Sequence, residues 1–429
     1  MTMAVALLAG CASTDQRIST DDPTRILVTI VQTESGLRSS GNPVRRFRRR
    51  ASYVADAEET ALDALAQRYR LMRFDGWPID VLDVYCEVFV VPANTSATTV
   101  LDRLKRDPRV ESAQLVQTFE TLSRPKLAKN PEALDDVQYA LTSMQVAQAH
   151  RRSRGEGVTI AVIDSWVDRR HPELLRTVVA DHDFSNRAHP FSADVHGTAV
   201  SGVIAAADDG VGITGVAPAA EILSLRACWA DTGNPGKEIC DSFSLAQALT
   251  RAISDDVDVI NLSLGGPEDS LLRRLVEKAI EEDIVVVSAW SEDKPFPSSV
   301  SGVLAVASLD DPAAKNSLSA PGKDVLTTVP NHGFDFRSGH SIAAAHGSGV
   351  IALALSLAPQ LDRLTLDSAL RMASMDAGLD ACAVLQYVAD TAGLAPLLCK
   401  REAQDNAGIG KISHGVAGAV IGPVQSKIQ

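Results

Sequence analysis

From about residue 137 onward, apolar runs of strand length alternate with segments of helical periodicity, which predicts a chain of buried strands and covering helices. These segments are Val158–Ile163, Ala199–Ala206, Glu221–Leu225, Leu245–Ser254, Val259–Leu262, Leu271–Glu281, Ile284–Ser288 and Val303–Ser308. Such alternation is typical of an α/β fold, a three-layer parallel sheet with helices on both faces. Reactive groups in such sheets gather at the carboxyl ends of the strands.

The last of these helices begins after a predicted flexible turn, Ser338-Gly339-His340, and Ser341 stands at the junction. Its small residues allow close approach to neighbouring elements, so we expect it to be central and buried. A helix start presents free N–H groups and the positive end of a dipole. Ser341 is therefore either a simple helix cap or a nucleophile whose own N–H helps to hold an oxyanion.

A smaller unit precedes this one, with a different order of elements. Ile26–Val31 is a predicted strand, Ala55–Leu71 a helix, Val81–Val91 a long β-rich run, Thr99–Lys105 a short helix, and Val110–Phe119 an alternating strand. This order predicts a small α+β ferredoxin-like βαββαβ domain.

Changes in composition divide the chain further. The predicted segments are a signal over 1–11, a polar tether over 12–24, the small domain over 25–122, a linker over 123–136, the large domain over 137–399 and a loosely ordered tail over 400–429. Two or three units are expected for 429 residues.

Charge and hydropathy exclude some classes of function. Lysine and arginine number 41 against 54 acidic residues, a balance of 41 − 54 = −13, which argues against a nucleic-acid partner. No apolar run is judged long enough to span a membrane. The first residues, MTMAVALLAGCASTD, are typical of an export signal, and Leu8-Ala9-Gly10-Cys11 resembles a bacterial lipoprotein signal with Cys11 lipidated, although no basic residue precedes the apolar run.

The remaining cysteines fit an oxidising compartment. Cys228 and Cys240 bracket one short segment, and Cys382 and Cys399 bracket another, so each pair is expected to form a disulfide. Neither spacing is that of a zinc site. Cys86 is left as a buried thiol. We therefore expect export to the cell envelope or secretion, with membrane contact only through a lipid anchor.

Three residues with complementary chemistry stand at predicted element ends, in the order Asp164, His196, Ser341. Serine becomes a nucleophile when a base takes its proton, and histidine is such a base near neutral pH. An aspartate fixes the histidine tautomer and stabilises the imidazolium.

Six stretches in this order resemble the motifs of subtilisin-like serine proteases. They are AVIDSWVDRRHPEL, HGTAVSGVIAA, ITGVAPAAEI, INLSLGG, LSAPGKDVLTTVP and GHSIAAAHGSGVIAL, within roughly residues 137–395. The resemblance implies the triad Asp164, His196 and Ser341, and implies that residues 25–122 are a propeptide that acts as an intramolecular chaperone and inhibitor.

The resemblance also implies further site residues, with departures. Leu264, Gly265 and Gly266 correspond to the edge that pairs with substrate backbone; a plain turn is the alternative. Ser288, Ala289 and Trp290 correspond to the substrate pocket, where Trp290 replaces a glycine and narrows it. Ser291 stands where the family has the oxyanion-binding asparagine. His340 and Ala345 replace the usual threonine and proline of the serine motif.

Glu173 and Asp209 correspond to family positions that hold a structural calcium, whose oxygen ligands suit that ion; solvated carboxylates are the alternative. His346 is expected to pack, and Asp168 and His171 to shape the turn after Asp164. The chemistry itself needs no cofactor.

The sequence thus predicts an exported serine endopeptidase that hydrolyses peptide bonds of protein or peptide substrates through an acyl-enzyme. The alternative is a catalytically weak or inactive pseudoprotease that binds peptides or envelope partners, which the substitutions at Trp290 and Ser291 favour.

Overall fold

The computed structural model describes residues 25–32, 58–126, 138–185, 194–234, 236–293, 295–314, 317–375, 378–396 and 399. The predicted signal with Cys11, the tether and the tail over 400–429 lie outside these residues.

The N-terminal unit is an antiparallel sheet covered by two helices. In chain order it contains β1 (Arg25–Val31), a helix over 58–69, β2 (Met72–Ile79), the short helix η1 (Asp80–Leu82), β3 (Val84–Val90), α2 (Ala97–Leu104) and β4 (Ser112–Leu115). The strand order β2-β3-β1-β4 is the ferredoxin-like arrangement that the sequence predicts. The residues of β2 were not predicted as a strand, because Gly76 and Pro78 interrupt the strand and its side chains do not alternate between buried and exposed.

The large unit is built on a seven-stranded, wholly parallel sheet, with the order β16-β15-β14-β12-β7-β9-β8. Its strands are β7 (Thr159–Asp164), β8 (Val178–Asp183), β9 (Glu221–Arg226), β12 (Val259–Leu262), β14 (Val285–Ala289), β15 (Leu304–Ser308) and β16 (Leu318–Ala320). The chain adds β8 and β9 on one side of β7 and β12 onward on the other. The order therefore reverses at β7, and sheets of this type bind ligands at such a point.

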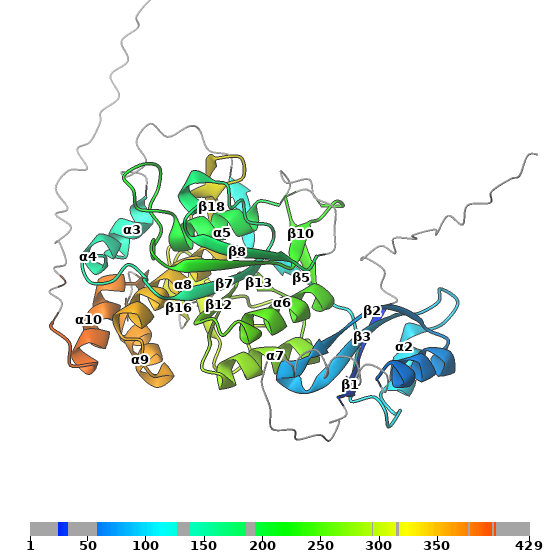
Figure 1. Cartoon of the computed structure of the whole chain (residues 1–429). Coiled ribbons are helices and arrows are strands. Elements are labelled where there is room, and N and C mark those ends of the chain that lie inside the picture. The colour runs from blue at the N-terminus through cyan, green and yellow to red at the C-terminus, as the bar shows by residue number, and fades with distance from the viewer. Residues whose placement is uncertain are drawn as a thin grey trace, which may run out of the picture.

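Helices cover both faces of this sheet, as the alternating pattern predicts (Figure 1). The helices are α3 (Tyr139–Ser143), α4 (Val146–Ala149), α5 (His196–Ala205), α6 (Ser242–Ser254), α7 (Ser270–Glu281), α8 (His340–Leu357), α9 (Arg363–Ala373) and α10 (Ala381–Thr391). α5 and α8 pack together on one face, and α6 and α7 pack together on the other. The fold class predicted from sequence is thus confirmed.

The central helix α8 is buried because its residues are small. An ideal Cβ on Gly349 would lie 2.5 Å from Cβ of Val216, so only glycine permits this approach. Contrary to the sequence-based judgement, α8 is long and apolar enough to cross a membrane, and it is the one such helix among the described residues. Because 78% of it is buried inside the protein, its apolar character is accounted for by packing in the core.

Two small sheets at the edge of the large unit include strands from the segment that links the two units. One sheet has the order β10 (Cys228–Ala230), β11 (Glu238–Asp241), β5 (Thr118–Thr121) and β13 (Leu264–Gly265). The other has the order β17 (Val325–Val329), β18 (Gly333–Gly339) and β6 (Ser123–Lys126). The minor elements are η3 (Pro172–Leu174), η4 (Pro312–Ala314), β19 (Ser374–Met375) and β20 (Gly378–Leu379).

These strands correct two predictions. Ser338 and Gly339, expected in a flexible turn, end strand β18, because they pair with Arg124 and Ser123 of β6. The predicted linker over 123–136 likewise begins with a paired strand. Long-range pairing of this kind leaves no local signal in a segment of mixed polar composition.

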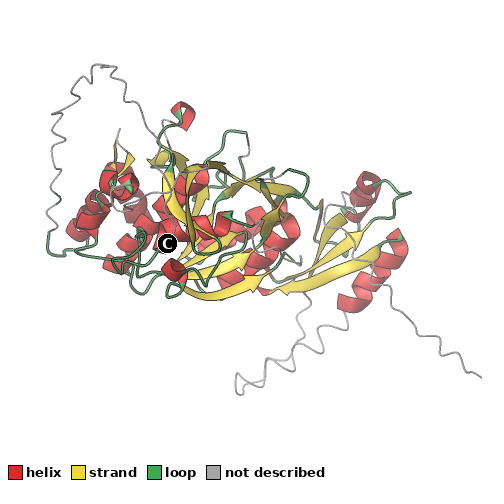
Figure 2. Ribbon diagram, turned by 90° about the horizontal axis from the view of Figure 1, so that it is seen from above, coloured by secondary structure: helices red, strands yellow, loops and turns green. Residues whose placement is uncertain are grey.

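The N-terminal unit docks on helices α6 and α7, and the two units lie side by side in both views (Figures 1 and 2). The rings of Phe74 and Trp77 contact Phe243 of α6 edge-on, with centroids 6.4 and 5.0 Å away. Beside them, the guanidinium of Arg25 donates to Asp241 at 3.2 Å, and this pair is almost completely buried. The docked position brings β5, at the end of the small domain, between β11 and β13.

Candidate active site

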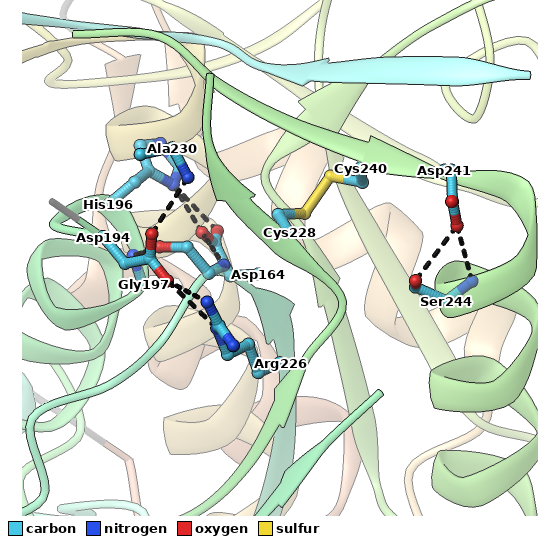
Figure 3. The surroundings of a disulfide bond; sticks show 11 residues. Asp164, Asp194, His196, Gly197, Arg226, Cys228, Ala230, Cys240, Asp241 and Ser244 are labelled. Carbon is cyan, nitrogen blue, oxygen red and sulfur yellow. Dashed lines mark hydrogen bonds and ion pairs between the residues drawn. A yellow bond between two sulfur atoms is a disulfide. The ribbon is translucent and has the colours of Figure 1, made fainter. Parts of the chain in front are cut away.

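Asp164 and His196 form a buried hydrogen-bonded pair at the carboxyl edge of the sheet (Figure 3). Asp164 is the last residue of β7, and His196 is the first residue of α5. Both carboxylate oxygens lie close to Nδ1 of His196, at 2.8 and 2.9 Å. This contact places the Nδ1–H toward Asp164 and leaves Nε2 with its lone pair free to take a proton.

The surroundings of His196 make it a stronger base. Burial alone lowers the pKa of its imidazole, but the charge of Asp164, the hydrogen bond to it and the charge of Glu238 outweigh burial and the nearby Arg337. The pKa of His196 is therefore raised above its ordinary value.

Ser341 is the second residue of α8 and lies two positions inside the cap. Gly339 is the N-cap, and the hydroxyl of Ser263 donates to the Ser341 carbonyl at 3.0 Å. Ser341 Oγ and His196 Nε2 are both buried, and neither has a hydrogen-bond partner within the described part of the chain. The serine oxygen and the basic nitrogen thus keep their hydrogen-bonding capacity for another group.

The protein's own chain enters this site as an extended segment. β5 pairs in antiparallel fashion with β13 on one side and β11 on the other. After β5, the N–H of Leu122 donates to the Ser263 carbonyl at 3.3 Å, and the Leu122 carbonyl accepts from the Ser341 N–H at 3.4 Å. The backbone of Leu122 is thus held next to the N–H group that stands at the start of α8.

The edge predicted to pair with substrate does pair with an extended strand. Leu264 lies opposite Thr121, and Gly265 lies opposite Glu120. Gly266 bonds in both directions to Phe296, through an N–H to carbonyl bond of 3.0 Å and the reverse bond of 3.3 Å. These contacts hold the edge between the extended segment and Phe296.

Phe119, three residues before Leu122, is fully buried against this edge. An ideal Cβ on Gly266 would lie 2.1 Å from Cδ1 of Phe119, so the absence of a side chain on Gly266 makes room for the ring. The Phe119 ring also meets Phe296 edge-on, with centroids 5.8 Å apart. The Phe119 ring is thus seated between Gly266 and Phe296, and this seat, the aromatic pocket of the edge, is a feature that the sequence did not reveal.

The residues assigned to the substrate pocket lie at the end of strand β14 and just after it, because the strand ends at Ala289. Ser288 and Ala289 are buried, and Trp290 is half-buried with its N–H donated to the Val306 carbonyl at 3.0 Å. The Trp290 ring contacts the His340 ring edge-on, with the ring centroids 5.4 Å apart. Ser291 follows at the carboxyl end of this strand, so its role in binding an oxyanion stays a prediction.

His340, which replaces the expected threonine, is turned toward strand β15 and the loop after it. Its Nδ1 accepts the N–H of Ser308 at 2.9 Å, and its Nε2 lies 3.2 Å from Asp311. Burial lowers the pKa of His340, with Asp311 opposing the shift. His346 is packed as expected, with Nδ1 2.8 Å from the Pro321 carbonyl and a pKa lowered by burial to about 4.

Glu173 and Asp209 lie near each other, in a place that suits a hard cation. Burial, and then the charge of Asp209, raise the pKa of Glu173 to about 7. Oε2 of Glu173 is buried without a hydrogen-bond partner among the described residues, and an ideal Cβ on Gly212 would lie 1.8 Å from Oε1. A cation that prefers oxygen ligands could be bound by both carboxylates, so these residues fit the calcium site that the resemblance implies.

Asp168 and His171 shape the turn after Asp164, as predicted. Asp168 accepts the N–H groups of Arg170 at 3.2 Å and Asn331 at 3.0 Å. His171 accepts the Glu173 N–H at 3.2 Å through Nδ1. The turn is thus tied both to itself and to the hairpin that leads into β18.

Both expected disulfides are present. Cys228 is joined to Cys240 directly across the β10–β11 hairpin, and Cys382 is joined to Cys399 near the end of the large unit. Cys86 is a buried free thiol, also as expected. Figure 3 shows the Cys228–Cys240 bond in the same region as the Asp164–His196 pair.

Sequence analysis missed two charged residues that face His196. Glu238 lies on β11 and Arg337 on β18, and the charges of both act on the His196 imidazole. The only signal for Glu238 is its position two residues before Cys240, in a segment that a disulfide was expected to hold.

The sheet, the acid–base pair at its carboxyl edge and the serine at a helix start define a class, the serine peptidases built on a parallel α/β sheet. Comparison with known proteins agrees, because residues 155–392 match the subtilase family, peptidase S8. This match covers more than half of the chain. The protein belongs to the subtilase family and is a serine endopeptidase, a hydrolase.

Individual relatives show how far the similarity extends. An intracellular serine protease of Paenibacillus polymyxa is 30% identical over 258 residues, covering 54% of this chain and 77% of the relative. A thermostable alkaline protease of Halalkalibacterium halodurans is 28% identical over 352 residues, covering 78% of this chain and 89% of the relative.

A solved structure extends the likeness in fold. Fervidolysin from Fervidobacterium pennivorans, a keratinolytic enzyme related to subtilisin, superposes with a TM-score of 0.65 at 20% identity. The match covers 87% of this chain and 61% of the fervidolysin chain. At this level of identity the likeness supports the fold alone.

Proposed function

We propose that the protein is made as a self-inhibited precursor that cleaves its own Leu122–Ser123 bond and then cuts other proteins by the same chemistry. One observation carries the proposal: the Leu122 carbonyl accepts a hydrogen bond from the N–H of Ser341. The chain is extended and paired on both sides of this bond, as a bound peptide substrate would be. β5 precedes the bond and β6 follows it.

The proposed reaction uses Asp164, His196 and Ser341. His196 Nε2 takes the Ser341 hydroxyl proton while Oγ attacks the carbonyl carbon. The resulting oxyanion is held by the Ser341 N–H, and the bond to the amine breaks as His196 returns the proton to the leaving nitrogen. Water then attacks the acyl-enzyme, with His196 again accepting and returning a proton. Asp164 stabilises the imidazolium at each stage.

Residues 25–122 act in this proposal as the propeptide, an intramolecular chaperone and inhibitor. The buried pair of Arg25 and Asp241 supports this role, since removing either partner would leave a buried charge uncompensated. Gln117 and Glu111 add contacts, because the Gln117 N–H donates to Ser242 at 2.8 Å and Glu111 lies 2.9 Å from Arg274. These contacts would hold the domain on the enzyme until it is cleaved and released.

Export is part of the proposal, and the two disulfides support it because such bonds persist in oxidising compartments. The Leu8-Ala9-Gly10-Cys11 pattern supports a lipid anchor on the envelope. Glu173 and Asp209 would hold a structural calcium, which would add rigidity to the loop near Gly212 and take no part in the chemistry.

The proposal is tested by labelling the purified protein with a fluorophosphonate probe, which reacts with activated serines. We expect label on Ser341 of the wild type, none on the Ser341→Ala variant, and digestion of casein by the wild type only. Absence of label from folded, full-length wild type and from its processed form would instead assign the chain to the peptide-binding pseudoproteases, which the serine at position 291 favours.

A further inference from the structure

We propose that Glu238 is a positioning residue for catalysis: it fixes the backbone that carries His196 and places a second negative charge beside the imidazole. The proposal deepens the proposed function and rests on the triad assigned there. Glu238 comes from a separate strand, β11, and is 6% exposed.

The first part of the role is geometric. Helix α5 begins at His196, and its N-cap residue Val195 offers no side-chain hydrogen bond to the helix start. Glu238 Oε1 takes that place, because it accepts the N–H of Val195 at 2.7 Å and the N–H of His196 at 3.0 Å. The first turn of the helix, and with it the catalytic imidazole, is thus held by a residue 42 positions away.

The second part is electrostatic. A carboxylate oxygen of Asp164, a ring nitrogen of His196 and a carboxylate oxygen of Glu238 all lie within 4.8 Å of one another, and all three residues are buried. At such distances away from water, a carboxylate stabilises the imidazolium strongly. Burial, together with the charge of Asp164, raises the pKa of Glu238 overall, whereas the charge of His196, the Ser165 hydroxyl and the Val195 N–H oppose this shift by favouring the ionised carboxylate.

Charged groups on three elements act on His196. Asp164 on β7 and Glu238 on β11 raise the pKa of the imidazole, whereas burial and Arg337 on β18 lower it. Arg337 is itself paired with Asp335 at 3.0 Å, and the negative charge of Asp335 partly offsets the effect of Arg337 on the imidazole. Removing the charge of Glu238 therefore makes His196 easier to deprotonate.

Glu238 also connects the catalytic base to the extended segment that enters the site. Its neighbour Ile239 pairs with Glu120 of the extended segment, and the Cys228–Cys240 bond closes the hairpin that carries both residues. A peptide bound along β11 thus lies on the same strand that holds the start of α5. Substrate binding and the position of His196 are coupled through a single short strand.

The test compares self-processed wild type with Glu238→Gln, which keeps an oxygen acceptor for the two N–H groups but removes the charge. The substrate is acetyl-Phe-Ala-Ala-Leu p-nitroanilide, which has no titrating group, so the pH profile of kcat/KM reports the enzyme. Glu221→Gln, at the exposed amino end of β9, is the matched control.

For Glu238→Gln we expect the acid limb of kcat/KM to move to lower pH and the plateau kcat to fall on the order of tenfold, because the imidazolium of the transition state loses a stabilising charge. Glu221→Gln should leave both unchanged. Glu238→Ala should lose more turnover than Glu238→Gln, and its thermal midpoint shows whether helix capping is lost as well.

An active Glu238→Gln enzyme whose acid limb coincides with that of the wild type, or moves to higher pH, would overturn the inference. That result would leave the proposed function intact. A wild type that takes up no fluorophosphonate would instead remove the proposed function, so the two failures are distinguishable.

Discussion

Gly266→Ala is expected to close the aromatic pocket on the substrate edge while leaving the chemistry untouched. Gly266 has no positive φ, so alanine can adopt its backbone conformation. Its new Cβ would lie 2.1 Å from Cδ1 and 2.7 Å from Cε1 of Phe119. The edge cannot move aside easily, because both polar backbone groups of Gly266 are bonded to Phe296.

The expected magnitude follows from the burial of the ring that is displaced. Full burial of a phenylalanine side chain is worth about 1.5–3 kcal/mol. The edge-on contact with Phe296 adds about 0.5–1.5 kcal/mol. Losing most of this sum, about 2–4 kcal/mol, lowers kcat/KM by about 30- to 1,000-fold for a substrate with phenylalanine in the position of Phe119.

The assay compares two peptides that differ only at that position, acetyl-Phe-Ala-Ala-Leu and acetyl-Ala-Ala-Ala-Leu p-nitroanilide. Gly266→Ala should abolish the preference of the wild type for the phenylalanine peptide and change cleavage of the alanine peptide less than threefold or so. Gly233→Ala, in the exposed β10–β11 loop where an added Cβ meets only Asp231 at 3.4 Å, is the control. An equal loss on both peptides, or an undiminished preference for phenylalanine, would refute the assignment of this pocket.

Three further outcomes are expected. Ser291→Asn should raise kcat and Ser291→Ala lower it, since loss of the asparagine donor costs about 2.7–4 kcal/mol in subtilisin itself; no change in steady-state kinetics for either variant would show that this loop does not face the reacting carbonyl. In EDTA the thermal midpoint should fall as pH rises from the ordinary Glu173 pKa of 4.5 toward its folded value of about 7, because the folded state holds the proton more tightly. Calcium should remove this fall, roughly 5 °C in size, and Glu173→Gln should not show it; a midpoint indifferent to calcium contradicts the site. Cys11→Ala should release the protein from the membrane fraction, and unchanged association would exclude the lipid anchor.

The sequence was most informative where a functional residue can be recognised from a short local pattern. Asp164, His196 and Ser341 each stand at the end of an element whose apolar pattern is local, so the pattern alone places them at the edge of one sheet. The cysteine pairs were predictable for the same reason, because each pair closes a short segment.

What could not be predicted depends on contacts between distant segments. Arg25 and Asp241 are 216 positions apart, and the sequence around each residue does not indicate that they form an ion pair. Glu238 was missed because it stabilises a helix that begins 42 positions earlier. Residues 123–126 were assigned to a linker because their pairing partner, strand β18, lies some 200 residues further along the chain. In each case the local composition is compatible with a solvated loop.

In the proposed maturation, Ser341 cleaves the Leu122–Ser123 bond held at the start of α8. The most direct test is the N-terminal sequence and intact mass of the large fragment from freshly purified wild type and from Ser341→Ala. We expect a wild-type fragment that begins Ser-Arg-Pro-Lys at Ser123, and an uncut chain for the variant. A variant that is still cut before Ser123 in the absence of other proteases, or a folded wild type that leaves this bond intact, would contradict it.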